Sequence, residues 1–300
     1  MPSDLHAAIL RWYDQHARDL PWRSPAATPW GVLVSELMLQ QTPVSRVLPV
    51  WEAWMQRWPT PAALAADPPG AAVRAWGRLG YPRRALRLHA CALTVTSRHG
   101  GAVPDRLDQL RALPGVGEYT AAAVLAFAHR RRAVVLDTNV RRVLARVCDG
   151  VSAPTAASPV RAERLTAERL LPADDQVAAR WSVALMELGA LVCKVREPRC
   201  EACPVAAHCR WLADGRPAGL TAPRRQTYAG TDRQCRGTLL AVLRGSDVPV
   251  SGEQLAAAWV NEVQRARALD SLLADGLVER HGPDRFTLPG MAQPAAGAGA

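Results

Sequence analysis

The sequence predicts an all-α protein with at most a small β element near the C-terminus. Apolar residues recur mostly at helical spacing along the 300 residues, and strand-like alternation is scarce. A hydrophobic content of 49% with 21% charged residues is typical of a globular chain that buries a core. No apolar stretch approaches the roughly 20 residues of a membrane-spanning helix, and the charged, amphipathic N-terminus is unlike a signal peptide. We therefore expect a cytoplasmic protein that does not enter a membrane.

The first helices are marked by the residues at their ends. Thr28 is suited to cap a helix with Pro29 in its first turn, and the apolar pattern continues to about Gln41. Pro43 and Pro49 are then expected to interrupt the helical pattern.

Three more helices are predicted in the middle of the chain. The first spans about residues 105–113 with Asp105 as its cap, and the second begins near Glu118. The third begins at Asp137 or Thr138.

The C-terminal part has a separate pattern behind a linker at residues 216–232, which is rich in Pro, Gly, Arg and Thr. Three helices and two extended runs around a Gly-Pro turn fill residues 233–290, which is the order of elements in a winged-helix-like module. The last residues, 291–300, have a composition typical of a disordered tail. The helices are predicted at 233–244, 252–260 and 261–274, and the extended runs within 277–288.

The charge of the chain favours a polyanionic partner. The net charge is +10 and the sequence pI is about 10.0, although solubility alone explains part of such an excess. Lys194 is the only lysine, so nearly all cationic side chains are arginines. Any mechanism that needs a lysine amine therefore has almost no candidate.

The stretch LPGVGEYTAAA places Gly115, Val116 and Gly117 in a tight turn directly before a helix. Such a helix–turn–helix exposes backbone N–H groups at the positive end of the helix dipole, where a phosphate oxygen binds. Contacts with backbone phosphates carry no sequence preference. An ordinary turn between two helices is the alternative explanation of the same residues.

Four of the seven cysteines lie within seventeen residues, and two of them have CxxC spacing. The four thiolates of Cys193, Cys200, Cys203 and Cys209 can wrap one metal centre. A set without metal is disfavoured, because four free thiols so close together would be an oxidative liability. The chemistry of the thiols leaves zinc and an iron–sulfur cluster open.

Two carboxylates have environments that separate their expected pKa values. Glu36 has Val32, Leu33 and Leu39 as helical neighbours, and apolar surroundings raise the pKa of a carboxyl group. Such a group holds the proton that a general acid needs, unless it lies at the edge of the apolar stripe and points outward. Asp137 is expected at a helix N-terminus, where the dipole favours the ionised form and where a plain N-cap uses the same residue. The pair suits cleavage of a glycosidic bond through a cation-like transition state.

These features, in this order, resemble the helix-hairpin-helix DNA glycosylase superfamily that includes endonuclease III. The finer resemblance is to the adenine DNA glycosylases, which remove adenine mispaired with 8-oxoguanine, and it covers about residues 5–215. The motifs that carry it are LPWR (20–23), SELMLQQT (35–42), LGY (79–81), the hairpin, LDTNVRRV (136–143), MELGA (186–190) and the cysteine spacing.

The resemblance implies two helical lobes with double-stranded DNA bound across the cleft between them. A six-helix lobe at residues 29–134 is expected to carry Glu36 and the helix-hairpin-helix. Residues 1–28 are expected to join 135–215 in a second lobe, whose four cysteines hold a [4Fe–4S] cluster. One such enzyme engages one lesion, so a monomer that binds DNA containing an adenine mispair is expected.

The resemblance also implies roles for individual residues. Glu36 matches the acid that protonates the leaving adenine, and Asp137 matches the carboxylate that stabilises the deoxyribosyl cation. Tyr119 and Asn139 match residues that support the sugar and these carboxylates. The other matches are the pocket for the flipped adenine, formed by Arg18, Leu20, Trp22, Arg23 and Glu187, and the wedge beside it in the duplex, formed by Gln41 and Tyr81.

Three features depart from the family pattern. Thr138 stands where glycine is usual, and Pro82 stands where a second tyrosine is frequent. Residues 233–290 are too short and too helical for the Nudix-like domain that reads 8-oxoguanine in most members. A winged helix there would grip DNA through arginines such as Arg265 and Arg267, or would pack passively.

Three other functions fit part of the sequence. An endonuclease III-like enzyme that also cuts the strand needs a lysine amine, which the superfamily places in the hairpin helix where this chain has Tyr119. A thymine mismatch glycosylase shares that tyrosine, but Glu36 with Glu187 favours a purine. A non-enzymatic iron–sulfur DNA-binding regulator leaves Glu36 and Asp137 unexplained. We therefore expect a monofunctional base excision repair enzyme that leaves an abasic site in an intact strand.

Overall fold

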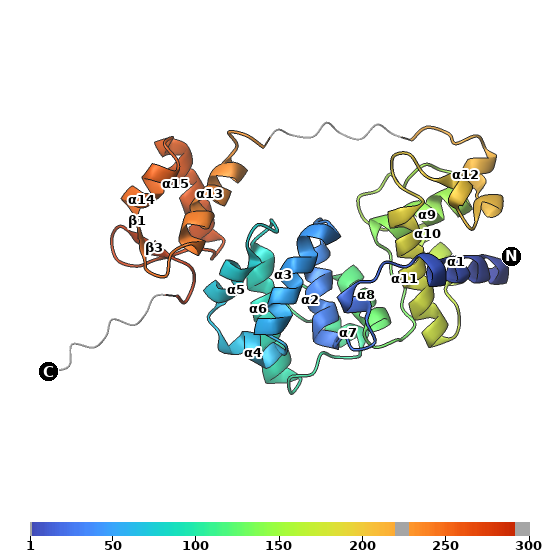
Figure 1. The fold of residues 1–300 in the computed structure, drawn as a ribbon, viewed down its shortest axis with the longest axis horizontal. Coiled ribbons are helices and arrows are strands. Elements are labelled where there is room, and N and C mark those ends of the chain that lie inside the picture. Colours follow the sequence, from blue (N-terminus) through green and yellow to red (C-terminus); the bar gives the residue numbers. More distant parts are fainter. Residues whose placement is uncertain (1, 220–227, 292–300) are drawn as a thin grey trace. The chain divides into compact units, whose positions relative to one another are not determined.

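A computed structural model describes residues 2–219 and 228–291 of the chain (Figure 1). The predicted all-α class is confirmed there, because helices dominate and the strands are short. No helix in these two ranges is long and apolar enough to cross a bilayer. Residues 220–227 of the predicted linker and residues 292–300 of the predicted tail lie outside the described residues.

The chain divides into two compact units, and α2 (Pro29–Leu39) begins in the first and ends in the second. The boundaries of the units differ from those of the two lobes expected at 29–134 and at 1–28 with 135–215, and those lobes stay a prediction. Unit 1 comprises Met1–Leu33, Asp105–Ala112 and Val116–Pro223, and unit 2 comprises Val34–Pro104, Leu113–Gly115 and Arg224–Ala300.

Unit 1 is built around α11 (Asp175–Leu191), against which α1 (Pro2–His16) and α9 (Thr138–Leu144) pack (Figure 1). Apolar side chains from these helices, including Ile9 and Leu188, are fully buried in one continuous core. The other elements of the unit are 3-10 turns at Pro21–Arg23, Cys200–Ala202 and Ala206–His208, a π-helical turn at Ala145–Asp149, and α7 (Leu107–Arg111), α8 (Glu118–Phe127), α10 (Arg161–Leu170) and α12 (Arg210–Ala213).

The predicted start of α2 is confirmed, but its predicted end is two residues too long. The Thr28 hydroxyl accepts a hydrogen bond from the Gly31 N–H at 3.1 Å, so it caps the helix as expected. The helix ends at Leu39 because Gln41 has a φ of +57°, which a right-handed helix does not allow.

Two further expectations are wrong, and the reasons are local. α7 begins at Leu107, since the Asp105 carboxylate accepts from Arg131 at 2.7 Å and caps nothing. Pro49 lies inside α3 (Val44–Arg57) instead of interrupting it, because the apolar face of that helix is buried. The starts of α8 at Glu118 and of α9 after Asp137 are confirmed.

Unit 2 combines α3 with α4 (Pro61–Ala66), α5 (Pro69–Trp76) and α6 (Arg83–Arg98), and α4 and α5 both pack against α6 (Figure 1). Three indole rings are buried at its centre. Trp54 meets Trp58 and Trp76 edge-to-face, with ring centroids 4.7 and 5.7 Å apart. Such pairs stabilise a core beyond the burial of their area.

The C-terminal module of unit 2 (residues 228–291) contains the three helices and two strands that the sequence predicts. The helices are α13 (Asp232–Arg244), α14 (Gly252–Ala258) and α15 (Glu262–Ala274). The strands β2 (Glu279–Arg280) and β3 (Arg285–Thr287) flank the Gly-Pro turn, and β3 lies between β2 and β1 (Val250–Ser251) in an antiparallel sheet. The two-residue strand β1 is too short to leave a periodic signal in the sequence.

The module is fastened to the rest of unit 2 by hydrogen bonds to backbone groups. Arg244 donates from Nε to the Val73 carbonyl at 2.9 Å and from Nη1 to the Gly77 carbonyl at 2.5 Å. Gly70 N donates to the Pro289 carbonyl at 2.7 Å, and a Cβ on Gly70 would lie 2.6 Å from that oxygen. Glycine is therefore needed for this close approach.

Replacing Arg244 by methionine is expected to destabilise the junction. The variant leaves the carbonyls of Val73 and Gly77 without this donor, and we expect the free energy of unfolding in urea to fall by about 1–3 kcal/mol. Arg233→Met, at an exposed position on the same helix, is the matched control with little expected change. Equal stability of both variants would show that the hydrogen bonds of Arg244 contribute nothing to the stability of the junction.

Candidate functional site

Asp137 is the N-cap of α9, and both of its carboxylate oxygens accept hydrogen bonds. Oδ1 accepts from the Val140 N–H at 2.6 Å, and Oδ2 accepts from the Asn139 side-chain amide at 2.8 Å. Burial nevertheless raises the pKa of Asp137, while these donors and the nearby Arg142 guanidinium lower it by less. The sequence predicts the opposite direction, because a helix N-terminus is visible in a sequence and the extent of burial is not.

Asn139 links this carboxylate to the segment that carries the first of the four clustered cysteines. Its Oδ1 accepts from Arg142 Nη2 at 2.8 Å, and Arg142 Nε donates to the Cys193 carbonyl at 2.7 Å. α9 and α11 approach closely here, since a Cβ on Gly189 would lie 2.7 Å from the Asn139 Cβ. Arg142 lies within the motif LDTNVRRV, but no sequence pattern indicates its function or these partners.

Glu187 brings together the charged members of the predicted adenine pocket. Arg18 donates from Nε and Nη2 to the two carboxylate oxygens at 2.7 and 2.8 Å, and Arg23 donates from Nη2 at 2.8 Å. Glu187 is fully buried, and Leu20 and Trp22 are also buried. Burial alone would raise the pKa of Glu187, but the two arginines lower it to about 2.

Replacing Glu187 by glutamine is expected to lower stability most at neutral pH. The pKa of Glu187 is depressed in the folded chain, so its ionised form stabilises the fold above the unfolded value of about 4.3. That stabilisation is lost as the pH falls toward about 2. Thermal unfolding should therefore show the melting temperatures of the wild type and of Glu187→Gln converging as the pH falls. Glu168→Gln, which removes an exposed ion pair with Arg132, should change little at any pH.

Glu36 lies in α2 with 5% of its surface exposed, so it does not point outward from the apolar stripe. Its helical neighbours Val32 and Leu33 are buried at 3% and 0% exposure. The predicted burial of this carboxyl group is confirmed. Glu36 belongs to unit 2, whereas Asp137 and Glu187 belong to unit 1.

The predicted hairpin is present as α7, a turn and α8. Gly115 has a φ of +79°, and a Cβ there would lie 2.9 Å from the Arg87 Cβ, so both conformation and space require glycine. Gly117 is the N-cap of α8 and is exposed. One turn into α8, the Tyr119 hydroxyl donates to the Met186 sulfur at 3.8 Å, next to Glu187 in sequence.

The two predicted wedge residues both lie in exposed turns of unit 2. Gln41 has a φ of +57° and Tyr81 has a φ of +48°, a conformation that few non-glycine residues adopt. The Tyr81 side chain is 58% exposed.

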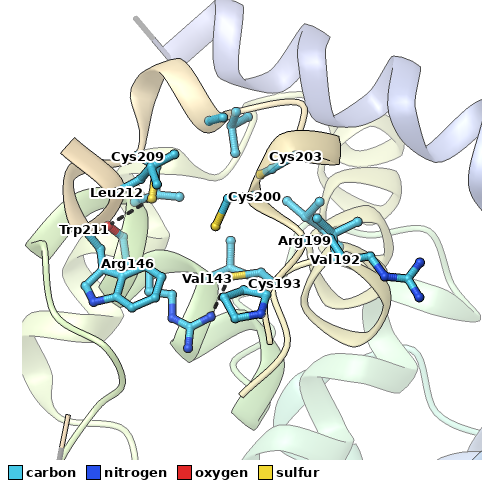
Figure 2. Close-up of a pocket in the computed structure, with 15 residues that line it drawn as sticks. Val143, Arg146, Val192, Cys193, Arg199, Cys200, Cys203, Cys209, Trp211 and Leu212 are labelled. Carbon is cyan, nitrogen blue, oxygen red and sulfur yellow. Dashed lines mark hydrogen bonds between the residues drawn. The ribbon is translucent and has the colours of Figure 1, made fainter. Parts of the chain in front are cut away.

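The four clustered cysteines line one pocket in unit 1 (Figure 2). Most of the other lining residues are apolar, including Val143 and Leu188, and the charged ones are Arg146 and Arg199. Arg146, 2% exposed, donates from Nη1 to the Cys193 sulfur at 3.3 Å, and the Cys209 thiol donates to the Arg146 carbonyl at 3.6 Å (Figure 2). In the described part of the chain, no three His, Cys, Asp or Glu side chains are arranged to hold a metal ion.

The C-terminal module offers few free cations for DNA. Arg267 donates to the Asp232 carboxylate at 2.7 Å from both Nε and Nη2, and Arg265 donates to the Trp259 carbonyl at 2.7 Å. Residues 228–291 contain seven arginines and eight acidic residues, in a chain of net charge +10. The contacts and the charge favour passive packing over a grip on phosphates.

Comparisons with known proteins agree with the resemblance seen in the sequence. Residues 34–169 match the model of the HhH-GPD superfamily of base excision DNA repair proteins. An adenine DNA glycosylase of Mycolicibacterium smegmatis is 53% identical over 94% of this chain and 95% of its own length. A solved thermostable thymine-DNA glycosylase is 27% identical with a TM-score of 0.64, covering 71% of this chain and 97% of that one. An endonuclease III in a non-covalent complex with DNA shares the fold, at 21% identity and a TM-score of 0.59 over 72% of this chain and 98% of that one.

Proposed function

Because the chain belongs to the HhH-GPD superfamily of base excision DNA repair proteins, we propose that it hydrolyses the N-glycosidic bond of adenine mispaired with 8-oxoguanine or guanine. Its activity is that of an adenine DNA glycosylase. The observation that carries the proposal is the 53% identity to such an enzyme over nearly the whole chain. The proposal includes a monomer in the cytoplasm that acts on double-stranded DNA.

The proposed reaction uses the buried carboxyl group of Glu36 and the partly buried one of Asp137 in turn. Glu36 donates its proton to N7 of adenine, the bond between C1′ and N9 breaks, and the electron pair leaves with the base. The Asp137 carboxylate stabilises the resulting deoxyribosyl cation. Water then attacks C1′ while Glu36 takes back a proton, and an abasic site remains. Support for these roles comes from the burial of Glu36 and from the fixed position of the Asp137 oxygens.

The hydrogen bonds of Asp137 have a further purpose in this scheme. The cation needs an ionised carboxylate, yet burial raises the pKa of Asp137. Donation from Val140 N–H and from Asn139 favours the ionised form, so these donors support the active state.

The pocket proposed for the flipped adenine is held by Glu187 and its two arginines, with Trp22 and Leu20 as apolar walls. Tyr119 stands where a strand-cutting relative has its lysine, and Lys194 lies beside the cysteine segment. Without a lysine amine near the sugar, no Schiff base can form, and the strand is expected to stay whole.

The four cysteines are proposed to hold a [4Fe–4S] cluster. All four line one largely apolar cavity, and the buried Arg146 guanidinium beside Cys193 is suited to offset thiolate charge. Burial raises the pKa of Cys203 to about 11, so this thiol must lose its proton when iron binds. When bound, the cluster would join the cysteine segment into one cross-linked loop. Iron and sulfide analysis of the purified protein should find about four of each per chain.

A single-turnover excision assay tests the function. Duplexes carry adenine opposite 8-oxoguanine, guanine or cytosine, and a fourth carries thymine opposite guanine. We expect release of adenine opposite 8-oxoguanine and guanine, with strand scission only after alkali treatment. Release of thymine would favour the second candidate function, that of a thymine glycosylase. The similarity to the thermostable thymine-DNA glycosylase is the observation that supports this candidate. Scission without alkali would contradict the monofunctional mechanism.

A further inference from the structure

Arg84, at the start of α6, joins the two turns that carry the proposed wedge residues. It is 5% exposed, and its guanidinium lies between the turn before Gln41 and the turn before Tyr81. The guanidinium donates hydrogen bonds to five acceptors. Nη1 donates to the carbonyls of Leu37 at 3.1 Å, Met38 at 3.2 Å and Gln40. Nη2 donates to the Thr42 hydroxyl and to the Gly80 carbonyl, both at 3.1 Å.

Two of these acceptors are the carbonyls of the peptide bonds that directly precede the wedge residues. The Gln40 carbonyl lies in the peptide bond to Gln41, and the Gly80 carbonyl lies in the peptide bond to Tyr81. The N–Cα bond that follows each of these peptide bonds has a positive φ, at Gln41 and at Tyr81. Such a conformation persists only where surrounding contacts hold it. Arg84 therefore binds both strained turns at the carbonyl that directly precedes the residue with positive φ.

Further contacts complete the link between the turns. The guanidinium carbon of Arg84 lies 5.3 Å from the ring centroids of both Trp76 and Tyr81. Trp76 Nε1 also donates to the Gly80 carbonyl at 2.9 Å, and the Thr42 hydroxyl donates to the Leu79 carbonyl at 3.2 Å.

The charge of Arg84 is not needed for an ion pair. Among the described residues no carboxylate lies within ion-pair distance of it, and burial lowers the pKa of Arg84 to about 10. A buried cation without an anionic partner costs stability, and the hydrogen bonds of Arg84 to backbone carbonyls offset part of that cost.

We propose that Arg84 is a positioning residue that holds the Gln41 and Tyr81 turns in the form that enters the duplex, so that it governs extrusion of the base. This inference rests on the proposed function, because the wedge has meaning only for an enzyme that flips its target. Arg84 touches no reacting atom, and Glu36 lies one residue before the first of its carbonyl partners.

The chain offers a matched control in Arg244. This arginine also donates to two backbone carbonyls in unit 2, and burial likewise lowers its pKa to about 10. Its carbonyl partners, Val73 and Gly77, differ from the five acceptors of Arg84, and Gly77 lies four residues before Tyr81. A purely structural role for Arg84 predicts similar behaviour of the two methionine variants.

The experiment compares single-turnover excision by Arg84→Met and Arg244→Met on two duplexes. One carries adenine opposite 8-oxoguanine, and the other carries adenine opposite an abasic-site analogue, where unpairing costs little. We expect Arg84→Met to slow excision at least about tenfold on the mispair and at most about threefold on the unpaired adenine. 2-Aminopurine beside the target should show a slower rise in fluorescence with Arg84→Met, whereas Arg244→Met should match the wild type on both duplexes.

Equal slowing of Arg84→Met on both duplexes, or an unchanged fluorescence trace, would overturn the inference. If Arg84→Met does not fold, Arg84→Lys and Arg244→Lys take the places of the two methionine variants, and the same criteria apply. Wild-type protein that releases no adenine from any mispair would refute the proposed function itself. Wild-type activity without the difference between duplexes would refute only the role of Arg84.

Discussion

Glu36→Gln is expected to lower the single-turnover rate of adenine excision by about 10²–10⁴-fold. Glutamine has nearly the shape of a protonated glutamic acid, so the buried position in α2 is preserved. It carries no acidic proton, and adenine would have to leave without protonation at N7. The measurement is the rate of abasic-site formation on a duplex with adenine opposite 8-oxoguanine.

Binding and folding serve as internal checks for this variant. The dissociation constant for the same duplex and the melting temperature should stay close to those of the wild type. Glu52→Gln, at an exposed position in α3, is the matched control and should retain full activity. Near-wild-type excision by Glu36→Gln would remove this residue from the mechanism.

Asp137→Asn is expected to slow excision by about 10²–10³-fold, because a neutral amide cannot stabilise the deoxyribosyl cation as a carboxylate does. The variant should still bind substrate DNA. The comparison is Asp174→Asn, which replaces an exposed N-cap of α11 that accepts from the Val177 N–H at 2.9 Å. Since asparagine is also a good N-cap, Asp174→Asn should leave both activity and stability nearly unchanged.

The Asp137→Asn variant should also differ from the wild type in how its stability depends on pH. Burial raises the pKa of Asp137 in the folded chain, so the folded state binds a proton more tightly than the unfolded state. Wild-type stability is therefore lost as the pH rises from the unfolded value of about 3.9 through the folded value. The amide that replaces the carboxyl group does not titrate. The free energy of unfolding of the variant should therefore rise relative to that of the wild type over this pH range.

Urea denaturation at a series of pH values measures this difference. Asparagine also places a second amide beside Asn139, which adds a loss of stability that does not depend on pH. The slope of the difference with pH is therefore the informative quantity. A difference that falls as the pH rises would mean that the donors to Asp137 outweigh its burial, and a difference that stays flat would mean that the two effects cancel.

Local patterns in the sequence were sufficient for the class of the fold and for many element ends. Thr28 caps α2 because a hydroxyl before a proline satisfies backbone donors wherever the chain lies. The Gly-Pro turn between β2 and β3 needs only local backbone preferences. Gly115 is identifiable for the same reason, since only glycine adopts its φ of +79° without strain.

Contacts between residues distant in sequence were not predictable in the same way. Asp105 was expected to cap a helix, but Arg131 binds its carboxylate. Asp137 was expected to be ionised by the helix dipole, but burial raises its pKa. Both corrections depend on neighbours that the fold supplies.

The sequence by itself determined which residues carry the chemistry: a glutamate on an apolar helix face, an aspartate at a helix start, four spaced cysteines and a tyrosine in place of lysine. Only the tertiary structure decided what surrounds them. Arg18 and Arg23 converge on Glu187 across more than 160 residues, and Arg84 joins two turns about 40 residues apart. The physical reason is that hydrogen-bond partners and burial are properties of packed helices, whereas caps and glycine turns are properties of neighbouring residues.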